Sequence, residues 1–222
     1  MWNLGIAPLK LVIGNYNYSS WSLRAWFFIK RSGLVFDVER LALFEPDFKS
    51  TILSISDAAR VPVLIDGDHV IWDTLAICEY VREAHLANGG GPSDVYDRAR
   101  ARSLVSEIHS GIPALRHALP MNCRAKRRVE LTQDVQSEIQ RIDQMWCDPW
   151  FVSARERCVD LGILDAFFAP IASRFKTYAI ELSPKAREYQ TWLLATPEMQ
   201  EWERMAQLET EVIELEEVGT PL

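Results

Sequence analysis

The stretch from Leu9 to Gly33 constrains the fold of this 222-residue chain most strongly. A short apolar run, Leu9 to Ile13, leads through a polar turn into a segment whose apolar residues recur at helical spacing up to Gly33. In such a turn the backbone N–H groups and the positive end of the helix point the same way, which favours binding of an anion. We expect Ser19 or Ser20 to cap the helix.

The remainder of the first 85 residues alternates between strand and helix patterns. Asp66-Gly67 is a typical two-residue hairpin turn, and Asp73 and Thr74 are favourable residues for a helix start. The expected strands are 9–13, 36–40, 61–65 and 69–72, with helices after residue 19, within 46–56 and after 73. The order βαβαββα predicts an α/β domain with a four-stranded mixed sheet.

Everything after residue 94 has helical periodicity, which predicts an all-α second domain. The expected boundaries are a first domain over 1–87, a glycine-rich linker over 88–94, and a helical domain over 95–222. One helix should run from about Ala101 to Leu119, bent by Pro113. The acidic tail beyond Arg204 should be a solvated end of the chain.

Composition excludes several classes of function. A net charge of −7 argues against nucleic acid or an anionic membrane as the main partner. No apolar run is long enough to span a bilayer, and the N-terminus does not resemble a signal peptide, so we expect a cytoplasmic protein. The four cysteines are too dispersed for a metal site or a disulfide framework.

Three short motifs occur one after another in the predicted first domain. They are Ser19-Ser20-Trp21-Ser22-x-Arg24, Val61-Pro62 and Asp73-Thr74. Together with the βαβαββα order and the helical second half, they resemble the cytosolic glutathione transferases. The likeness is closest to the serine-type members of the zeta class. It implies a thioredoxin-like first domain, a cis peptide bond at Val61-Pro62, glutathione as co-substrate without a metal, and a homodimer.

The resemblance places Ser19 at the catalytic position, with Ser20 as a second hydrogen-bond donor or only the helix cap. A serine is too weak a base to deprotonate a thiol, but its hydroxyl can donate a hydrogen bond to the thiolate. Such a bond is worth roughly 1.5–3 kcal/mol, which lowers the thiol pKa by about 1–2 units. Capping alone would also explain either serine.

Further residues follow from the same resemblance. Val61 would pair with the cysteinyl backbone of glutathione, Asp73 and Thr74 would bind its γ-glutamyl end, and Arg60 could pair with its glycine carboxylate. The electrophile would lie between the domains, near residues selected by position: Trp21, His109, Ser110, Met121 and Asn122.

The likeness leaves the reaction open. The expected activity is conjugation of glutathione to a small electrophile. A glutathione-dependent cis–trans isomerase of the maleylacetoacetate type is one alternative, although Trp21 stands where the zeta class typically has cysteine. A non-catalytic binding or interaction module is the other.

Overall fold

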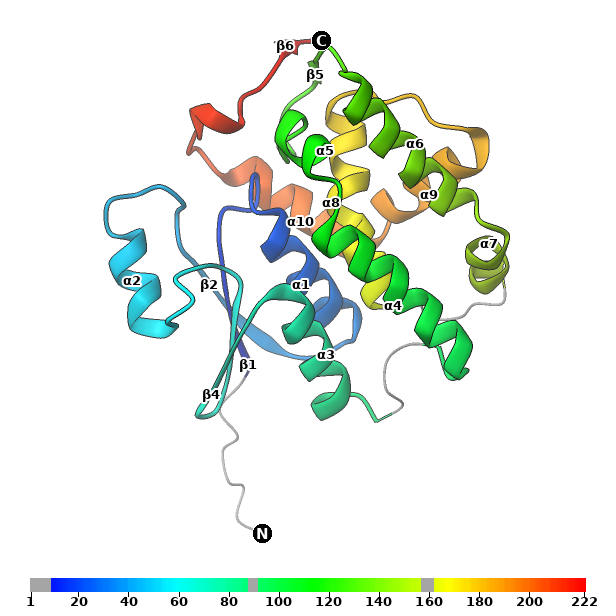
Figure 1. The fold of residues 1–222 in the computed structure, drawn as a ribbon. Helices are drawn as coiled ribbons and strands as arrows, with labels where there is room; N and C mark the ends of the chain where they lie inside the picture. The colour runs from blue at the N-terminus through cyan, green and yellow to red at the C-terminus, as the bar shows by residue number, and fades with distance from the viewer. Residues whose placement is uncertain (1–8, 88–91, 157–161) are drawn as a thin grey trace.

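The computed structural model describes residues 9–87, 92–156 and 162–222 (Figure 1). Its N-terminal half contains the predicted four-stranded mixed sheet in the order β2-β1-β3-β4. Strand β1 (Leu9–Ile13) pairs in parallel with β2 (Phe36–Arg40) and antiparallel with β3 (Val63–Asp66), which forms the predicted hairpin with β4 (His69–Trp72). The thioredoxin-like fold class is therefore confirmed.

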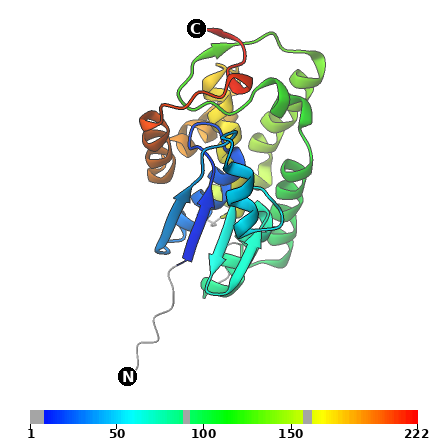
Figure 2. The same cartoon turned by 90° about the vertical axis from the view of Figure 1, so that its left-hand side faces the viewer.

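The two faces of this sheet are covered by different helices. Because successive side chains of a strand point to opposite faces, Leu11 and Ile13 join the main hydrophobic core while Val12 joins a small separate cluster. Ile52 of α2 (Phe48–Ile55) completes that small cluster. Helices α1 (Ser20–Arg31) and α3 (Thr74–His85) lie against the opposite face (Figure 2).

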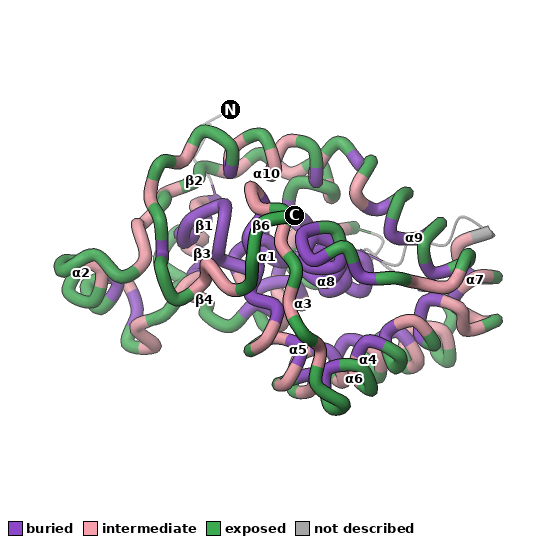
Figure 3. The backbone as a smooth tube through the Cα atoms, turned by 90° about the horizontal axis from the view of Figure 1, so that it is seen from above, coloured by how far each residue is buried: buried purple, intermediate pink, exposed green. Residues whose placement is uncertain are grey.

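The C-terminal half is helical, as predicted. Its helices are α4 (Val95–Ser110), α5 (Pro113–Ala118), α6 (Gln133–Cys147), α7 (Pro149–Glu156), α8 (Ile163–Thr177), α9 (Pro184–Leu194) and α10 (Pro197–Leu208), with the 3-10 turn η1 (Glu214–Glu216) and the two-residue strands β5 (Arg127–Arg128) and β6 (Thr220–Pro221). Helix α8 is the most deeply buried and lies at the centre of the molecule (Figure 3).

Helix α1 is shared between the two halves. It packs on α3 within the N-terminal half and on α8 and α10 of the C-terminal half. Trp26, Phe27 and Ile29 of α1 belong to one hydrophobic core that also contains Phe167 of α8 and Trp202 of α10.

The predicted linker, 88–94, lies partly outside the described residues. Within the described ranges, no helix is long and apolar enough to cross a membrane.

The expectation of one bent helix across Pro113 is wrong. Helix α4 ends at Ser110, and Pro113 begins a separate helix, α5. Between them Gly111 caps α4 in an extended conformation, and Ile112 has a left-handed backbone with a φ of 52°. A proline lacks the N–H group that a helix interior requires but is suited to the first turn of a helix, so the chain restarts here.

The acidic tail is not a solvated end, in contrast to the sequence-based expectation. Residues 209–222, which we call the C-terminal strap, fold back over the turn between β1 and α1 (Figure 1). The strap ends at β6, which pairs with β5. The carboxylates of Glu209 and Glu217 accept hydrogen bonds from residues that are distant in the sequence. These bonds hold the strap against the rest of the protein.

Candidate functional site

The turn between β1 and α1 ends in two buried serines with different hydrogen bonds. Ser19 is the N-cap of α1, as expected, and its Oγ accepts the backbone N–H of Ser22 at 3.4 Å. Its hydroxyl also donates to Ser22 Oγ at 2.7 Å, and that oxygen in turn accepts the N–H of Gly14. The hydroxyl hydrogen of Ser19 is therefore used inside the turn.

Ser20 has a charged neighbour instead. Its Oγ accepts a hydrogen bond of 3.2 Å from Nη2 of Arg174, a residue of α8 that is only 4% exposed. The same guanidinium donates to the carbonyl groups of Leu119 and Pro170. Burial lowers the pKa of Arg174 to about 10. The hydroxyl hydrogen of Ser20 has no acceptor within the described ranges, so it remains available to a ligand.

A cavity of about 580 Å³ lies beside this helix start. All five residues predicted to bind glutathione line it, together with two of those expected at the electrophile site and with Ala58 and Trp72. The predicted lining residues are Arg60, Val61, Pro62, Asp73, Thr74, Trp21 and His109. The Val61–Pro62 peptide bond is cis. Neither Ser19 nor Ser20 is a lining residue, although they are the two residues before Trp21.

Asp73 has two roles in the geometry of this cavity. Its Oδ1 accepts the backbone N–H groups of Leu75 and Ala76 at 2.9 and 3.2 Å, which caps α3. Its Oδ2 lies 3.4 Å from Nε2 of His109, a residue of α4. The backbone of Asp73 has a φ of 70° and a ψ of 132°, a conformation outside the left-handed helical region that is strained for a residue with a Cβ. Since His109 comes from the helical half, both halves of the chain form the cavity.

Trp21 separates the cavity from a buried positive charge. The guanidinium carbon of Arg24 lies 4.3 Å from the centre of the Trp21 ring and 4.9 Å from that of Phe167. Arg24 is fully buried, and none of its three guanidinium nitrogens has a hydrogen-bond partner in the described part of the chain. Burial and the neighbouring Arg174 and Arg116 hold its pKa well below the ordinary value. The positive charge behind Trp21 favours an anionic ligand group nearby.

Three residues expected at the electrophile site lie elsewhere. Ser110 is exposed and its hydroxyl donates to the carbonyl of Ser106. Met121 is fully buried in the main core. Asn122 is buried and joins the side chains of Asn17 and Glu217. These positions could not be predicted, because a helical period does not determine where a connecting segment passes.

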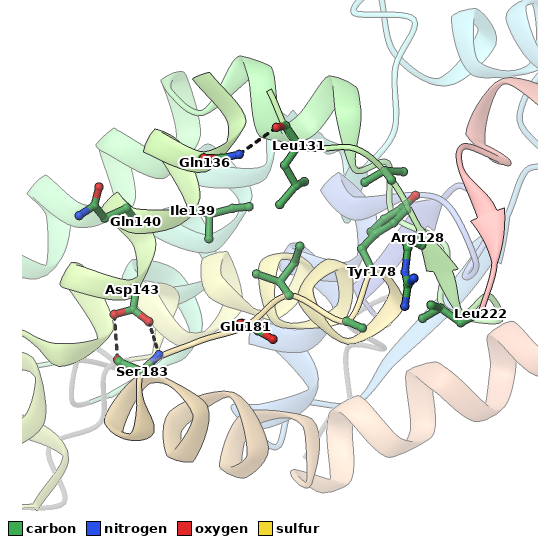
Figure 4. A pocket seen from close by; sticks show the side chains of 13 residues that line it. Arg128, Leu131, Gln136, Ile139, Gln140, Asp143, Tyr178, Glu181, Ser183 and Leu222 are labelled. Carbon is green, nitrogen blue, oxygen red and sulfur yellow. Dashed lines mark hydrogen bonds between the residues drawn. The ribbon is translucent and has the colours of Figure 1, made fainter. Parts of the chain in front are cut away.

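A second cavity, of about 630 Å³, was not expected from the sequence (Figure 4). It is an open groove between α6 and the segment that follows α8, with Leu222 at one end. Asp143 lines the groove, and its carboxylate accepts hydrogen bonds from the N–H and the hydroxyl of Ser183. None of the predicted site residues lines it. Within the described ranges, no group of His, Cys, Asp and Glu residues could hold a metal ion.

Comparison with known proteins agrees with this geometry. Residues 18–84 match the family model of the glutathione S-transferase N-terminal domain. The chain is 32% identical over 106 residues to a probable maleylacetoacetate isomerase of Caenorhabditis elegans, covering 48% of this chain and 50% of that protein. It is 34% identical over 113 residues to glutathione S-transferase Z1 of Arabidopsis thaliana, covering 50% of each. Residues 18–84 therefore resemble the glutathione S-transferase N-terminal domain. The chain spans about half the length of the curated relatives that it matches.

Solved structures extend the likeness in fold to almost the whole chain. A glutathione transferase homologue from Burkholderia, with bound glutathione, superposes with a TM-score of 0.67 at 23% identity, over 90% of this chain and 98% of that one. Ure2p in complex with glutathione gives a TM-score of 0.67 at 17% identity, over 91% and 96%. At these identities the likeness establishes the glutathione transferase fold and leaves the substrate open.

Proposed function

We propose that the protein is a glutathione transferase that stabilises the glutathione thiolate for attack on a small electrophile. The observation that carries this proposal is the single cavity lined by Arg60, Val61, Pro62, Asp73 and Thr74. These residues come from the segment before β3 and from the start of α3, and together they offer the groups that a γ-glutamyl tripeptide needs.

The groups complement the ligand from end to end. Asp73 would pair with the α-ammonium group, and the N-terminus of α3 at Thr74 would bind the γ-glutamyl carboxylate. Val61 would pair with the cysteinyl backbone, and the exposed Arg60 with the glycine carboxylate. The Thr74 hydroxyl already donates to the carbonyl of Trp21, so its backbone N–H is the group that serves the ligand.

The serine hydrogen bonds favour Ser20 as the donor to the thiolate. Ser19 uses its hydrogen within the turn, whereas Ser20 accepts from a guanidinium and keeps its hydrogen available. A donor that itself accepts a charge-assisted bond is polarised, which strengthens the bond it gives. Because Trp21 lines the cavity and the serines do not, this proposal includes movement of the Trp21 side chain when glutathione binds.

The test is a calorimetric glutathione titration followed by the ultraviolet absorbance of the bound thiolate against pH. We expect binding, with a thiol pKa about 1–2 units below that of free glutathione. Ser20→Ala should remove most of that shift and leave the dissociation constant within about twofold, since the two ends of the ligand bind elsewhere. If Ser19→Ala removes the shift and Ser20→Ala does not, the activating residue is Ser19. Absence of binding at millimolar glutathione would refute the proposed function.

Two other functions share the fold. Similarity to a protein named as a probable maleylacetoacetate isomerase supports the isomerase alternative, in which the thiolate adds to a double bond and is then released. The likeness to Ure2p, whose crystallised fragment is described as the nitrogen regulation fragment of a yeast prion protein, supports a non-catalytic role. An electrophile screen that includes cis-enones separates conjugation from isomerisation, and no turnover at all favours the non-catalytic role.

We also propose that the protein acts in the cytoplasm as a homodimer. Strand β4 is an edge of the sheet and exposes Val70 and Trp72, and the start of α4 exposes Val95 and Tyr96. Exposed apolar side chains of this size favour burial against a partner. Light scattering after size-exclusion chromatography tests this proposal, and a species of about 25 kDa would refute the dimer.

A further inference from the structure

The C-terminal strap binds the turn that carries the two serines. Glu209 Oε1 accepts the backbone N–H of Tyr16 at 2.7 Å, and its Oε2 accepts that of Asn17 at 2.8 Å. The Glu209 side chain is only 6% exposed, and Arg40 lies 3.3 Å from it. The N–H groups of this turn, which the sequence suggested for binding a ligand's anion, are therefore occupied by a carboxylate of the protein itself.

Glu217 of the strap binds the next residue of the turn, Tyr18. Glu217 Oε1 accepts the hydroxyl of Tyr18 at 2.7 Å and the side-chain N–H of Asn122 at 2.7 Å. The other oxygen of Glu217 binds Arg127. Three consecutive residues, 16 to 18, are thus bound by the strap, and the next two residues are the serines.

The turn is also bound by α10. The carbonyl of Tyr16 accepts the indole N–H of Trp202 at 2.8 Å, so both backbone polar groups of Tyr16 are used by the end of the chain. Asn17 is buried, and its side chain bonds Asn122 and the backbone of Arg124. Hydrogen bonds to a charged acceptor are among the strongest in proteins, so Glu209 contributes most of the fixed geometry at this point.

We propose that Glu209 is a positioning residue for thiolate formation, acting through the turn that places the Ser19 and Ser20 hydroxyls. The inference rests on the proposed function, since it concerns how the same site is held ready. A hydroxyl stabilises a thiolate only within hydrogen-bond reach, so small displacements of the helix start weaken the effect strongly. The residues expected to bind the two ends of glutathione belong to other segments, and in the described part of the chain none of them forms a hydrogen bond or ion pair with the Glu209 carboxylate.

The test compares Glu209→Gln with Glu211→Gln in the full-length protein. Glutamine has nearly the shape of glutamate, but its amide NH₂ meets one of the two backbone donors, so one hydrogen bond is lost. Glu211 is a matched control, because it also lies in the strap and pairs with Arg40, at 2.7 Å, but does not contact the turn. Retained folding of both variants is checked by circular dichroism.

Hydrogen exchange without any ligand is the first measurement. We expect peptides covering residues 15–20 to exchange about tenfold faster in Glu209→Gln than in wild type or in Glu211→Gln. The second measurement is the pKa of the bound glutathione thiol. It should rise by about 1 unit in Glu209→Gln with the glutathione dissociation constant changed less than about twofold.

The outcomes separate this inference from the proposed function. If wild type lowers the thiol pKa and Glu209→Gln lowers it equally, the positioning role is refuted while the transferase proposal stands. Unchanged exchange in Glu209→Gln would also refute it, because the strap would then not hold the turn. If wild type does not bind glutathione, the transferase proposal fails, and exchange still reports whether Glu209 orders the turn.

Discussion

Replacing Asp73 separates two roles that coincide in one carboxylate, capping of α3 and binding of glutathione. Asn is as good a helix cap as Asp and bears the same backbone strain, so Asp73→Asn should change the free energy of unfolding by only a few tenths of a kcal/mol. Asp73→Ala loses the two cap hydrogen bonds, at about 1 kcal/mol, while the Cβ strain at a φ of 70° is the same for both residues. For a chain of this length, that loss lowers the melting temperature by roughly 2–4 °C.

Glutathione affinity should respond differently. Both variants remove the negative charge that faces the α-ammonium group. A fully buried charge-assisted bond would be worth roughly 1.5–3 kcal/mol, but the Asp73 side chain is 45% exposed, so solvent screening reduces this to about 1–1.5 kcal/mol. The expected loss of affinity is about 5- to 12-fold in both variants. The assays are scanning calorimetry and titration calorimetry on the same samples. Unchanged affinity in Asp73→Asn would show that the carboxylate only caps the helix.

Three further substitutions test the remaining features. Arg24→Met removes a buried guanidinium that has no described hydrogen-bond partner but lies over the Trp21 and Phe167 rings, so urea unfolding should show a loss below about 2 kcal/mol, and a larger loss would mean that the guanidinium is hydrogen-bonded in solution. Trp202→Phe leaves the Tyr16 carbonyl with only the weak thiol donor of Cys123, at 3.8 Å, and should cost about 1–3 kcal/mol of unfolding free energy. Asp66 accepts from Tyr80 at 2.7 Å, which holds its pKa below the ordinary value. Its contribution is therefore present at neutral pH and lost as pH falls below about 4, and Asp66→Asn should flatten that acid dependence of stability.

The N-terminal fold was predictable because its signals are local. The apolar run Leu9–Ile13, the Asp66-Gly67 turn and the Asp73 cap each specify structure within a few residues, and all three occur as expected. The break at Pro113 was missed because the apolar spacing continues across it, and only the backbone of Ile112 reveals the new helix. The spacing of apolar side chains continues from one helix to the next when both helices pack on the same core, so the spacing does not show where one helix ends.

The sequence predicted most of the residues that line the candidate site, but not the hydrogen bonds that distant parts of the chain make to it. Motif order brought Arg60, Val61 and Asp73 to one cavity, because the α/β topology gathers strand ends at one edge. The choice between Ser19 and Ser20 depends on Arg174, which is more than 150 residues away in the sequence. The attachment of Glu209 spans a separation of 193 residues, and a cluster of acidic residues gives no local sign of it.

The sharing of α1 between the two halves bears on how such a protein can evolve. The family match over residues 18–84 suggests a module that could be exchanged, yet that module would carry Trp26, Phe27 and Ile29 into a new context that must match them. Recombination at the linker would join helices whose side chains do not fit each other. The protein would then lose stability through poor packing in the buried contact between α1 and α8. The helical half is therefore free to change its outer surfaces, while its central helix is obliged to change together with α1.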